Sequence, residues 1–551
     1  MPANFAIADL ERPIDVVSAY PSHDYTLRGF FESRAGHDPD RPFILTPLHT
    51  CSYRQFARQV DAAAAALATR GVGKGDRFAV MAGNGIAHAV LLFALARLGA
   101  ILVPVNPDFN VAEARYVLQH ADVCGVAAGE AALPIATDAC AGMARAPWFV
   151  VVGARQGDVP ALDEVMATAN PVAAPHTDLA DDTCAIVYTS GTTGFPKGVM
   201  HSQRTFCLAG ERHVERSWLQ RDGRFLCVLP MFHINSLFYS ISGTIAAGAD
   251  MVIAPRFSAS KFWELAATTG ATHTSLLMAA ATILARRPRH EFVAGHRLRI
   301  VIGSPVTREI ASTFIDEFGV KKLVEGFGMT EIPGAFGAPV DGPQTMGSMG
   351  RPGLHPDHGR PWTEARIVDD DMADVPDGKP GELLVRIPTV TQGYFRDPEQ
   401  TAAAFHDGWF RTGDIVRREA DGTYTFVTRK KDIIRRRGEN IAGSEIDRIV
   451  TAHPSVAEAA AIGVRADIGE EEVLVAVVLR NDATLSADEL RDWCSTRLAA
   501  FKVPRYVAFV TELPYTPTHK LAKHVLKQQP DLLARAIDLQ PPINTNTTAR
   551  P

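Results

Sequence analysis

The chain has 551 residues, of which 46% are hydrophobic and 21% are charged, and its formal net charge at pH 7 is -6. A chain of this length exceeds what one hydrophobic core usually supports, so we expect a soluble globular protein with two or more domains. The acidic balance argues against a general nucleic-acid-binding protein, which would normally be basic.

The termini and the cysteines indicate the cellular setting. Charged residues such as Asp9 and Glu11 interrupt the N-terminus, and the longest apolar stretch, residues 87–105, contains His88, Arg97 and Pro104. Neither stretch has the uninterrupted apolar core of a signal peptide or a membrane span. The 7 cysteines form no Cys-x-x-Cys pair, which indicates reduced thiols rather than disulfides or a zinc site. We therefore expect a cytoplasmic protein.

Strand-like apolar runs alternate with helical patterns from about residue 76 to residue 319. The first two pairs are a strand at 78–81 before a helix at 86–98, and a strand at 101–105 before a helix at 111–121. Further strands are expected at 224–229, 250–254, 273–277 and 298–302, each beside an amphipathic stretch. Such alternation predicts an α/β fold of mostly parallel sheets with helices on both faces.

The pattern changes near Pro361. Short strands at 365–368, 381–387 and 423–427 are separated by Asp-Gly and Pro-Gly turns, which predicts an antiparallel or barrel-like subdomain. A charged connector at 428–432 follows. We expect a large domain at 1–428 with its β-rich part at about 360–428. A small mobile α+β domain at 429–530 and a tail at 531–551, disordered from Gln540 onward, complete the chain.

The most informative stretch is residues 188–198, with the sequence Tyr-Thr-Ser-Gly-Thr-Thr-Gly-Phe-Pro-Lys-Gly. It follows an apolar run at 184–187 that is typical of a buried strand. Glycines let the backbone turn sharply, so N–H groups can point at one anion while hydroxyls and Lys197 add donors and charge. The residues of this phosphate-binding loop are Thr189, Ser190, Gly191, Thr192, Thr193, Gly194 and Lys197. It is not the Walker pattern, because Gly198 and not Ser or Thr follows the lysine; an ordinary polar loop is the less favoured interpretation.

This stretch resembles the signature of the adenylate-forming superfamily, which includes acyl-CoA synthetases, carrier-linked adenylation domains and firefly-type luciferases. The resemblance covers about residues 25–527 and looks closest to CoA ligases of the carnitine/crotonobetaine type. It implies an enzyme that activates a carboxylic acid with ATP as acyl-AMP, releasing pyrophosphate, and then transfers the acyl group to the CoA thiol, releasing AMP. The implied cofactors and partners are ATP, CoA, Mg²⁺ and a small carboxylic acid, without nucleic acid or a membrane span. The oligomeric state stays open, with a homodimer as one option.

Further segments resemble the superfamily in the expected order. His233, after Pro-Met-Phe, matches a residue beside the acyl pocket. By position alone, that pocket would be lined by Phe232, His233, Ser236, Leu237, Ser304 and Gly328. Gly303, Ser304 and Pro305 resemble the loop that lies against adenine.

The segment 325–331 implies nucleotide contacts from Glu325, Gly326, Phe327, Gly328, Met329 and Thr330. Phe327 would stack on adenine, Thr330 would bond the α-phosphate, and Glu331 would hold Mg²⁺.

The C-terminal motifs complete the implied site. Asp414, at the end of Asp-Gly-Trp-Phe-Arg-Thr-Gly-Asp, is suited to accept hydrogen bonds from both ribose hydroxyls. Arg429 resembles a second ribose or phosphate contact, and Lys431 falls at the family's hinge position. Gly438 would line the approach of the thiol. Lys520, after Leu-Pro-Tyr-Thr-Pro-Thr-His, would bridge the substrate carboxylate and the α-phosphate. The residues implied in catalysis are thus Lys520, Thr330, Glu331, Lys197 and His233.

Three positions depart from the family pattern: His519 and Thr428 replace glycines before the catalytic lysine and the hinge arginine, and Ile387 replaces a glycine. Several alternatives stay open. An enzyme that loads amino acids on a carrier protein usually has an aspartate in the acyl-pocket segment, where this chain has Ile234 and Asn235. A luciferase-like oxygenase would share every motif. A non-catalytic nucleotide-binding protein is disfavoured because the implied catalytic residues are all present.

Overall fold

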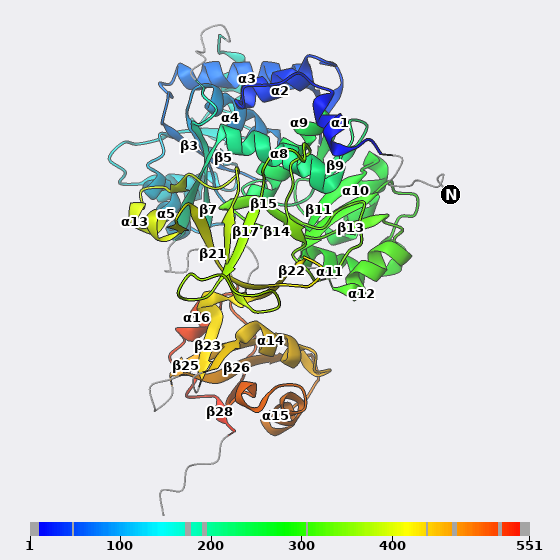
Figure 1. Cartoon of the computed structure of the whole chain (residues 1–551). Coiled ribbons are helices and arrows are strands. Elements are labelled where there is room, and N and C mark those ends of the chain that lie inside the picture. Colours follow the sequence, from blue (N-terminus) through cyan, green and yellow to red (C-terminus); the bar gives the residue numbers. More distant parts are fainter. Residues whose placement is uncertain are drawn as a thin grey trace, which may run out of the picture. The chain divides into compact units, whose positions relative to one another are not determined.

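The computed structural model describes residues 10–46, 49–170, 178–189, 196–304, 307–345, 347–436, 439–465, 471–515 and 521–539 (Figure 1). The chain divides into two compact units. The first comprises Met1–Ala365, Val385–Arg411 and Asp421–Tyr424, and the second comprises Arg366–Leu384, Thr412–Ala420 and Thr425–Pro551.

The first unit contains a seven-stranded sheet with the order β19-β8-β7-β4-β3-β5-β6. Its strands are β3 (Arg77–Met81), β4 (Ile101–Pro104), β5 (Gly125–Gly129), β6 (Trp148–Val152), β7 (Thr183–Thr189), β8 (Lys197–Ser202) and β19 (Gly393–Tyr394). The strands from β6 to β7 are parallel, and β8 and β19 then add antiparallel pairings at one edge. This edge brings residues from before 203 and after 392 into one sheet.

A second seven-stranded sheet in this unit has the order β13-β12-β11-β9-β10-β1-β2. Its strands are β1 (Pro42–Leu45), β2 (Thr50–Ser52), β9 (Arg224–Cys227), β10 (Asp250–Ile253), β11 (His273–Leu277), β12 (Ile300–Ser304) and β13 (Lys322–Val324). All pairings are parallel except that of β1 with β2. The predicted strands are present. The strand expected at 298–302 instead begins at Ile300, because register with β11 and β13, rather than the local apolar pattern, sets its ends.

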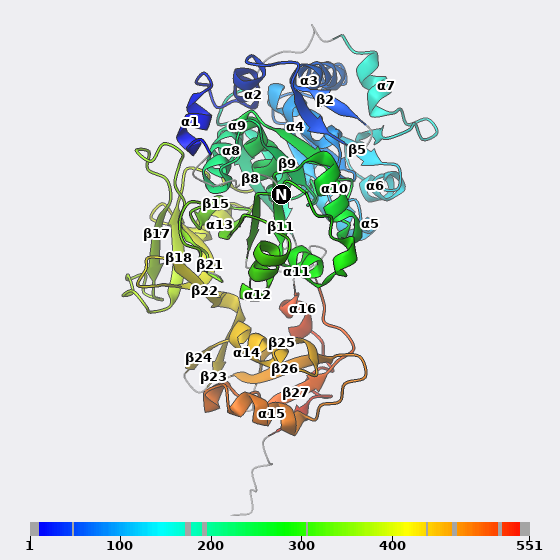
Figure 2. The ribbon, with the colours of Figure 1, turned by 90° about the vertical axis from the view of Figure 1, so that its right-hand side faces the viewer.

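Helices fill the space between the two sheets and cover their outer faces. They are α1 (Pro13–Ser18), α2 (Leu27–Ala35), α3 (Tyr53–Ala68), α4 (Ile86–Arg97), α5 (Val111–Ala121), α6 (Leu133–Cys140), α7 (Leu162–Ala167), α8 (Gln203–Ser217), the π-helix η3 (Asn235–Ile241), α9 (Ser242–Ala247), α10 (Phe262–Thr269), α11 (Met278–Arg286) and α12 (Arg308–Ser312). Successive residues of β3 point to opposite faces. Phe78 and Phe225 of β9 belong to the inner core. Met81 belongs to the outer core together with residues of α5 and α6, two helices that lie next to each other in Figure 2.

The β-rich part follows the parallel sheets. A three-stranded antiparallel sheet contains β14 (Gly326–Met329), β15 (Ile332–Gly337) and β16 (Arg351–Pro352). A five-stranded sheet contains β17 (Glu364–Val368), β18 (Gly381–Arg386), β20 (Phe405–His406), β21 (Trp409–Arg418) and β22 (Tyr424–Arg429), and α13 (Pro398–Ala403) precedes β20. The division between the two compact units passes through β17, β18, β21 and β22.

The C-terminal residues form a four-stranded sheet in the order β25-β26-β27-β28, with a separate hairpin. The elements are β23 (Ile433–Arg436), β24 (Glu439–Ala442), α14 (Gly443–Thr451), β25 (Val456–Arg465), β26 (Glu471–Leu479), α15 (Ala487–Ser495), β27 (Tyr506–Phe509), α16 (Lys523–Lys527) and β28 (Ile537–Asp538). Val475 and Leu474 of β26 lie in two different cores, so both faces of the sheet are covered. The predicted α/β fold class is confirmed. The tail from Gln540 lies outside the described residues.

Across the residues described, no helix has both the length and the apolar character needed to cross a membrane.

Helix α4 buries a histidine without a polar partner. His88 is 0% exposed, and neither ring nitrogen has a hydrogen-bond partner in the described part of the chain. Burial lowers the pKa of His88 to about 4, because the imidazolium would lose its hydration in the core. The ring is therefore neutral in the folded protein at pH 7, whereas the unfolded chain takes up a proton near pH 6.5.

We expect acid to destabilise the protein through this group. Because the folded pKa lies below the unfolded one, the stabilising contribution is complete above about pH 6.5 and is lost as the pH falls toward 4, by up to roughly 3 kcal/mol. His88→Leu should flatten the pH dependence of the thermal unfolding midpoint in this window, measured by circular dichroism. The exposed His290 supplies the control, since His290→Leu should keep the wild-type slope. Equal slopes for wild type and His88→Leu would contradict this assignment.

Candidate functional site

The predicted phosphate-binding loop joins two paired strands at the edge of the first sheet. Thr189 is the last residue of β7 and Lys197 is the first of β8, and the two are register partners. The strands thus extend further into the predicted loop than the glycine and hydroxyl pattern indicated. Ser190, Gly191, Thr192, Thr193 and Gly194 lie outside the described residues.

Lys197 lies close to a tyrosine that sequence analysis did not single out. Tyr394 of β19 pairs with Val199 of β8, and the Nζ atom of Lys197 lies 4.9 Å from the centroid of the Tyr394 ring. A two-residue strand gives no periodic signal, so only the tertiary pairing identifies Tyr394. The cation and the aromatic ring together border the point where β8 begins.

Tyr394 also contacts the predicted magnesium ligand. Its hydroxyl donates a hydrogen bond of 3.0 Å to Oε1 of Glu331, which is 7% exposed. Burial and the adjacent Glu331 carboxylate raise the pKa of Tyr394, so the hydroxyl keeps its proton and remains a donor. The Lys197, Tyr394 and Glu331 side chains therefore form one connected group, although they come from three distant parts of the sequence.

The backbone around Thr330 and Glu331 is held from two sides. The Thr330 carbonyl accepts a 2.7 Å hydrogen bond from Nε2 of the buried His201, and the Glu331 carbonyl accepts one of 2.7 Å from the Thr391 N–H. Burial lowers the pKa of His201 to about 4, so the ring is neutral and its Nε2–H donates. These two bonds fix the turn between β14 and β15, and thereby orient the two side chains predicted to bind phosphate and metal.

Strand β14 presents the remaining predicted nucleotide residues. Gly326 and Gly337 are register partners, as are Phe327 and Phe336, whose rings lie 6.0 Å apart. Phe327 and Met329 are half-buried and Gly328 is exposed. The carboxylate of Glu325 is buried and accepts the Gly347 N–H at 2.8 Å, so its side chain has a structural partner.

Strand β12 ends at the predicted adenine loop. Gly303 is buried and Ser304 is the last strand residue, and Pro305 lies outside the described residues.

The acyl-pocket segment lies between β9 and η3. The rings of Phe232 and His233 are 4.4 Å apart, and both side chains are partly exposed. Ser236 and Leu237 are fully buried, and the Ser236 hydroxyl donates to the Leu229 carbonyl at 3.0 Å. Of the residues expected by position to line the pocket, Ser236 thus has its hydroxyl committed to the protein.

Asn84 fastens the turn before this segment. Its amide nitrogen donates to the carbonyls of Leu229 and Ala254, and its oxygen accepts the Met231 N–H. The three bonds hold the turn that presents Phe232 and His233. The local sequence around Asn84 gives no sign of this role, because all three of its partners are distant in sequence.

The second compact unit contains the predicted ribose site. The Asp414 side chain is 0% exposed, and the Nε atom of Arg429 lies 2.6 Å from its Oδ1. The Asp414 N–H donates to the Thr412 hydroxyl, which donates to the Leu383 carbonyl. Two residues predicted from separate motifs are therefore direct partners.

The connector after Arg429 is anchored by an ion-paired lysine. Lys430 Nζ lies 2.9 Å from Glu382 and 2.8 Å from Asp370. Lys431, the predicted hinge residue, follows in the 3₁₀ turn Lys430–Asp432. Gly438 and Lys520, together with His519, lie outside the described residues.

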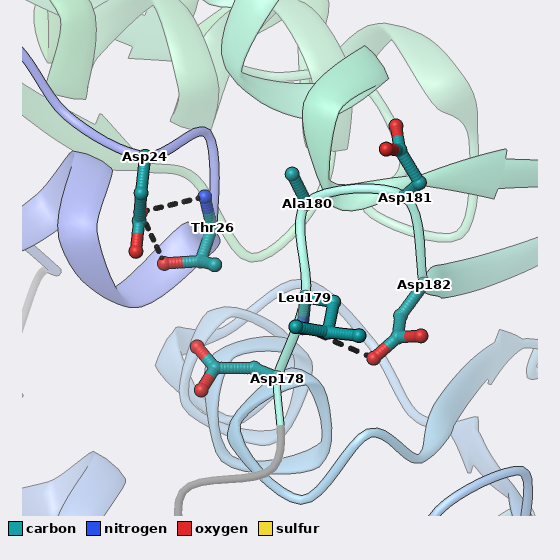
Figure 3. A pocket seen from close by; sticks show the side chains of 7 residues that line it. All are labelled: Asp24, Thr26, Asp178, Leu179, Ala180, Asp181 and Asp182. Carbon is teal, nitrogen blue, oxygen red and sulfur yellow. Dashed lines mark hydrogen bonds between the residues drawn. The ribbon is translucent and has the colours of Figure 1, made fainter.

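A pocket of about 480 Å³ in the first unit lies elsewhere and has the wrong charge for a nucleotide (Figure 3). Four aspartates line it: Asp24, Asp178, Asp181 and Asp182. All four carboxylates have protein partners: Asp24 accepts hydrogen bonds from Thr26, Asp178 pairs with Arg28, Asp181 pairs with Arg204, and Asp182 pairs with Lys74. An acidic wall of this kind repels phosphate, so this pocket is not the nucleotide site.

Comparison with known proteins agrees with the geometry. Residues 31–395 match the family described as AMP-binding enzyme, and residues 445–520 match the AMP-binding enzyme C-terminal domain. A sulfoacetate–CoA ligase of Cupriavidus necator is 34% identical over 506 residues, which cover 90% of this chain and 96% of that protein. A crotonobetaine/carnitine–CoA ligase of Escherichia coli is 30% identical over 488 residues, covering 86% and 93%.

Among solved structures, ATP-bound MatB from Rhodopseudomonas palustris superimposes with a TM-score of 0.81 at 28% identity, covering 90% of this chain and 98% of MatB. The match to the crotonobetaine/carnitine–CoA ligase confirms the predicted likeness to ligases of that type. The chain belongs to the AMP-binding enzyme family, and the prediction of an adenylate-forming acyl-CoA ligase is confirmed.

Proposed function

We propose that this ligase activates a small carboxylic acid as an acyl-adenylate with ATP and Mg²⁺ and then transfers the acyl group to CoA. The observation that carries the proposal is the connected group of Lys197, Tyr394 and Glu331 at the flanks of the phosphate-binding loop. A cation and an oriented carboxylate meet there, which suits a reaction in which charge develops on phosphoryl oxygens.

The first step is attack of the substrate carboxylate on the α-phosphorus of ATP, with pyrophosphate as the leaving group. Lys197 and the N–H groups of the loop stabilise the negative charge that builds on the phosphoryl oxygens, and Thr330 donates to the α-phosphate. Because His201 and Thr391 hold the turn at Thr330 and Glu331, the side chains of these two turn residues need little rearrangement during the reaction. The Asp414 carboxylate, with Arg429 beside it, would accept hydrogen bonds from the ribose hydroxyls.

Glu331 fits the role of a magnesium ligand. Its Oε1 accepts the Tyr394 hydroxyl, and a carboxylate keeps further lone pairs on its second oxygen for a hard cation. A magnesium ion bound there would neutralise part of the charge on the ATP phosphates.

The second step transfers the acyl group to the CoA thiolate, which displaces AMP. By family resemblance, the C-terminal domain that follows the hinge at Lys431 contributes Lys520 to the first step and Gly438 to the second. The need to exchange these two residues between steps explains why the C-terminal residues form a fold of their own after a charged connector, which is anchored through Lys430. The seven cysteines are free and buried, which supports a reducing compartment such as the cytoplasm as the place of action.

The reaction is tested by supplying ATP, Mg²⁺ and CoA with a panel of short, branched, aromatic, betaine-bearing and dianionic acids. Pyrophosphate and thioester should form together with at least one acid.

Lys520→Ala should slow pyrophosphate release by roughly a hundredfold, about 3 kcal/mol, because it removes one preorganised donor. Thioester formation from supplied acyl-AMP should change little, since Lys520 serves only the first step. Lys527→Ala serves as the control, because it changes another lysine of the same C-terminal segment of the sequence, one that pairs with Glu471. Failure of every acid would count against the ligase, and equal loss in both steps would count against the role of Lys520.

Tyr394→Phe tests whether the hydroxyl orients Glu331. Loss of this hydrogen bond to a charged acceptor should lower the rate of pyrophosphate release by roughly tenfold, about 1.5 kcal/mol, and raise the Mg²⁺ concentration needed for half-maximal rate. Tyr53→Phe provides the matched control, because it also removes a buried hydroxyl, which donates to the Ala249 carbonyl. An unchanged Mg²⁺ dependence in Tyr394→Phe would show that the hydroxyl has no part in metal binding.

A further inference from the structure

A buried arginine near the end of α8 forms no ion pair with any residue that the structure describes. Arg216 is 8% exposed, and its Nε is buried without a hydrogen bond. Within the described residues, no carboxylate lies within ion-pair distance of its guanidinium group. Arg212, one turn earlier on the same helix, differs in this respect: it donates to the Gly334 carbonyl and pairs with Glu215.

The guanidinium group lies against the β14–β15 hairpin. A methyl group built on Gly326 would be 2.7 Å from Nη2 of Arg216, and one built on Gly337 would be 3.6 Å from its Cγ. These two glycines are register partners, so the hairpin leaves room for the arginine at this position. Arg216 therefore lies beneath β14, the strand that carries Phe327 and Gly328 and leads into the turn at Thr330.

Tyr239 of η3 borders the same space. The Cζ atom of Arg216 lies 5.9 Å from the centroid of the Tyr239 ring. The Tyr239 hydroxyl accepts the Gly334 N–H at 2.8 Å and lies 3.0 Å from a methyl group built on the exposed Gly328. Since η3 begins two residues after His233, the arginine, the tyrosine and Gly328 adjoin the segment expected to form the acyl pocket.

A buried guanidinium group without an ion pair is costly, because it has lost its hydration. Glu215, which pairs with Arg212, attracts Arg216 only from beyond ion-pair distance. Burial lowers the pKa of Arg216 only to about 10, so the group stays charged at neutral pH. Its planar fork of N–H donors matches the oxygens of a carboxylate or sulfonate. An anionic group of a ligand would therefore supply the missing partner.

The acid is a better source of this anion than ATP. Strand β14 runs from Gly326 to Met329, so roughly 10 Å of strand separates Gly326 from the turn that contains Thr330. The phosphates belong at the Thr330 and Lys197 end, whereas Arg216 lies at the Gly326 end.

We propose that Arg216 binds a second anionic group of the acid, so that the enzyme selects short dianionic acids and adenylates the carboxylate remote from the arginine. This inference rests on the proposed ligase function. It assigns the substrate class as dicarboxylates or sulfocarboxylates rather than fatty, aromatic or betaine-bearing acids. Arg216 acts as a substrate-binding and specificity residue and takes no part in proton or phosphoryl transfer.

The test compares dianionic acids with monoanionic acids of matched size: succinate and 3-sulfopropionate against butyrate and the monomethyl ester of succinate. For wild type, kcat/KM from pyrophosphate release should be at least thirtyfold higher for the dianions. Arg216→Met should remove this preference by lowering the dianion values roughly thirtyfold or more, with little change for the monoanions and for the KM of ATP. Arg216→Lys should recover part of it. Preference for succinate over 3-sulfopropionate, or the reverse, identifies which anion the site takes.

The matched control is Arg34→Met. Arg34 is also buried, but it packs over the rings of Tyr20 and Phe30, so its loss should leave the preference for dianions unchanged. Circular dichroism of each variant identifies one that does not fold, in which case Arg216→Lys carries the comparison.

The outcomes separate the two proposals. If wild type uses monoanionic acids as well as the dianions, or if Arg216→Met keeps the preference, the arginine subsite is overturned while the ligase stands. If no acid yields pyrophosphate, the ligase proposal fails, and calorimetric titration with succinate and 3-sulfopropionate decides the subsite directly. Binding to wild type that is lost in Arg216→Met supports it, and absence of binding to wild type overturns it.

Discussion

The hydrogen bond from Tyr394 to Glu331 is the constraint on which the arrangement of the candidate site depends. It joins the edge strand β19 to the turn after β14, and β19 in turn pairs with β8, which begins at Lys197. One contact therefore sets where the carboxylate lies relative to the cation, although the three residues are separated by up to about two hundred positions. Because burial keeps the phenol protonated, this link does not depend on pH in the physiological range.

Much of the fold follows from local sequence, as the helix α5 illustrates. Its predicted limits, 111 and 121, agree with the structure because Asn110 and Glu113 form a capping box and Asp122 ends the helix in a left-handed conformation. The strand β11 likewise has its predicted limits. For Asp414 and Arg429, family resemblance identified two residues that the structure brings together as an ion pair.

What sequence could not supply is the set of pairings between distant segments. Tyr394 stands in a two-residue strand with no periodicity, and Asn84 lies in the turn between β3 and α4, where the local sequence does not indicate its partners. Each acquires its role from a partner far along the chain: Glu331 for Tyr394, and the carbonyl of Leu229 for Asn84. Arg216 is a further case, since α8 contains five charged residues and nothing in their spacing marks the one that lacks a counter-charge.

The residues proposed for the reaction chemistry and the residue proposed to select the acid belong to different structural elements. The groups proposed to bind phosphate belong to strand ends and to the turn after β14, where the pairing of strands fixes them. The residue proposed to choose the acid, Arg216, belongs to a helix packed beneath the hairpin, and it reaches the hairpin because Gly326 and Gly337 lack side chains. Replacing a residue of α8 can then change which acid binds without moving Lys197 or Glu331. This separation gives a physical reason why relatives with one common scaffold can be ligases for acids as different as sulfoacetate and crotonobetaine.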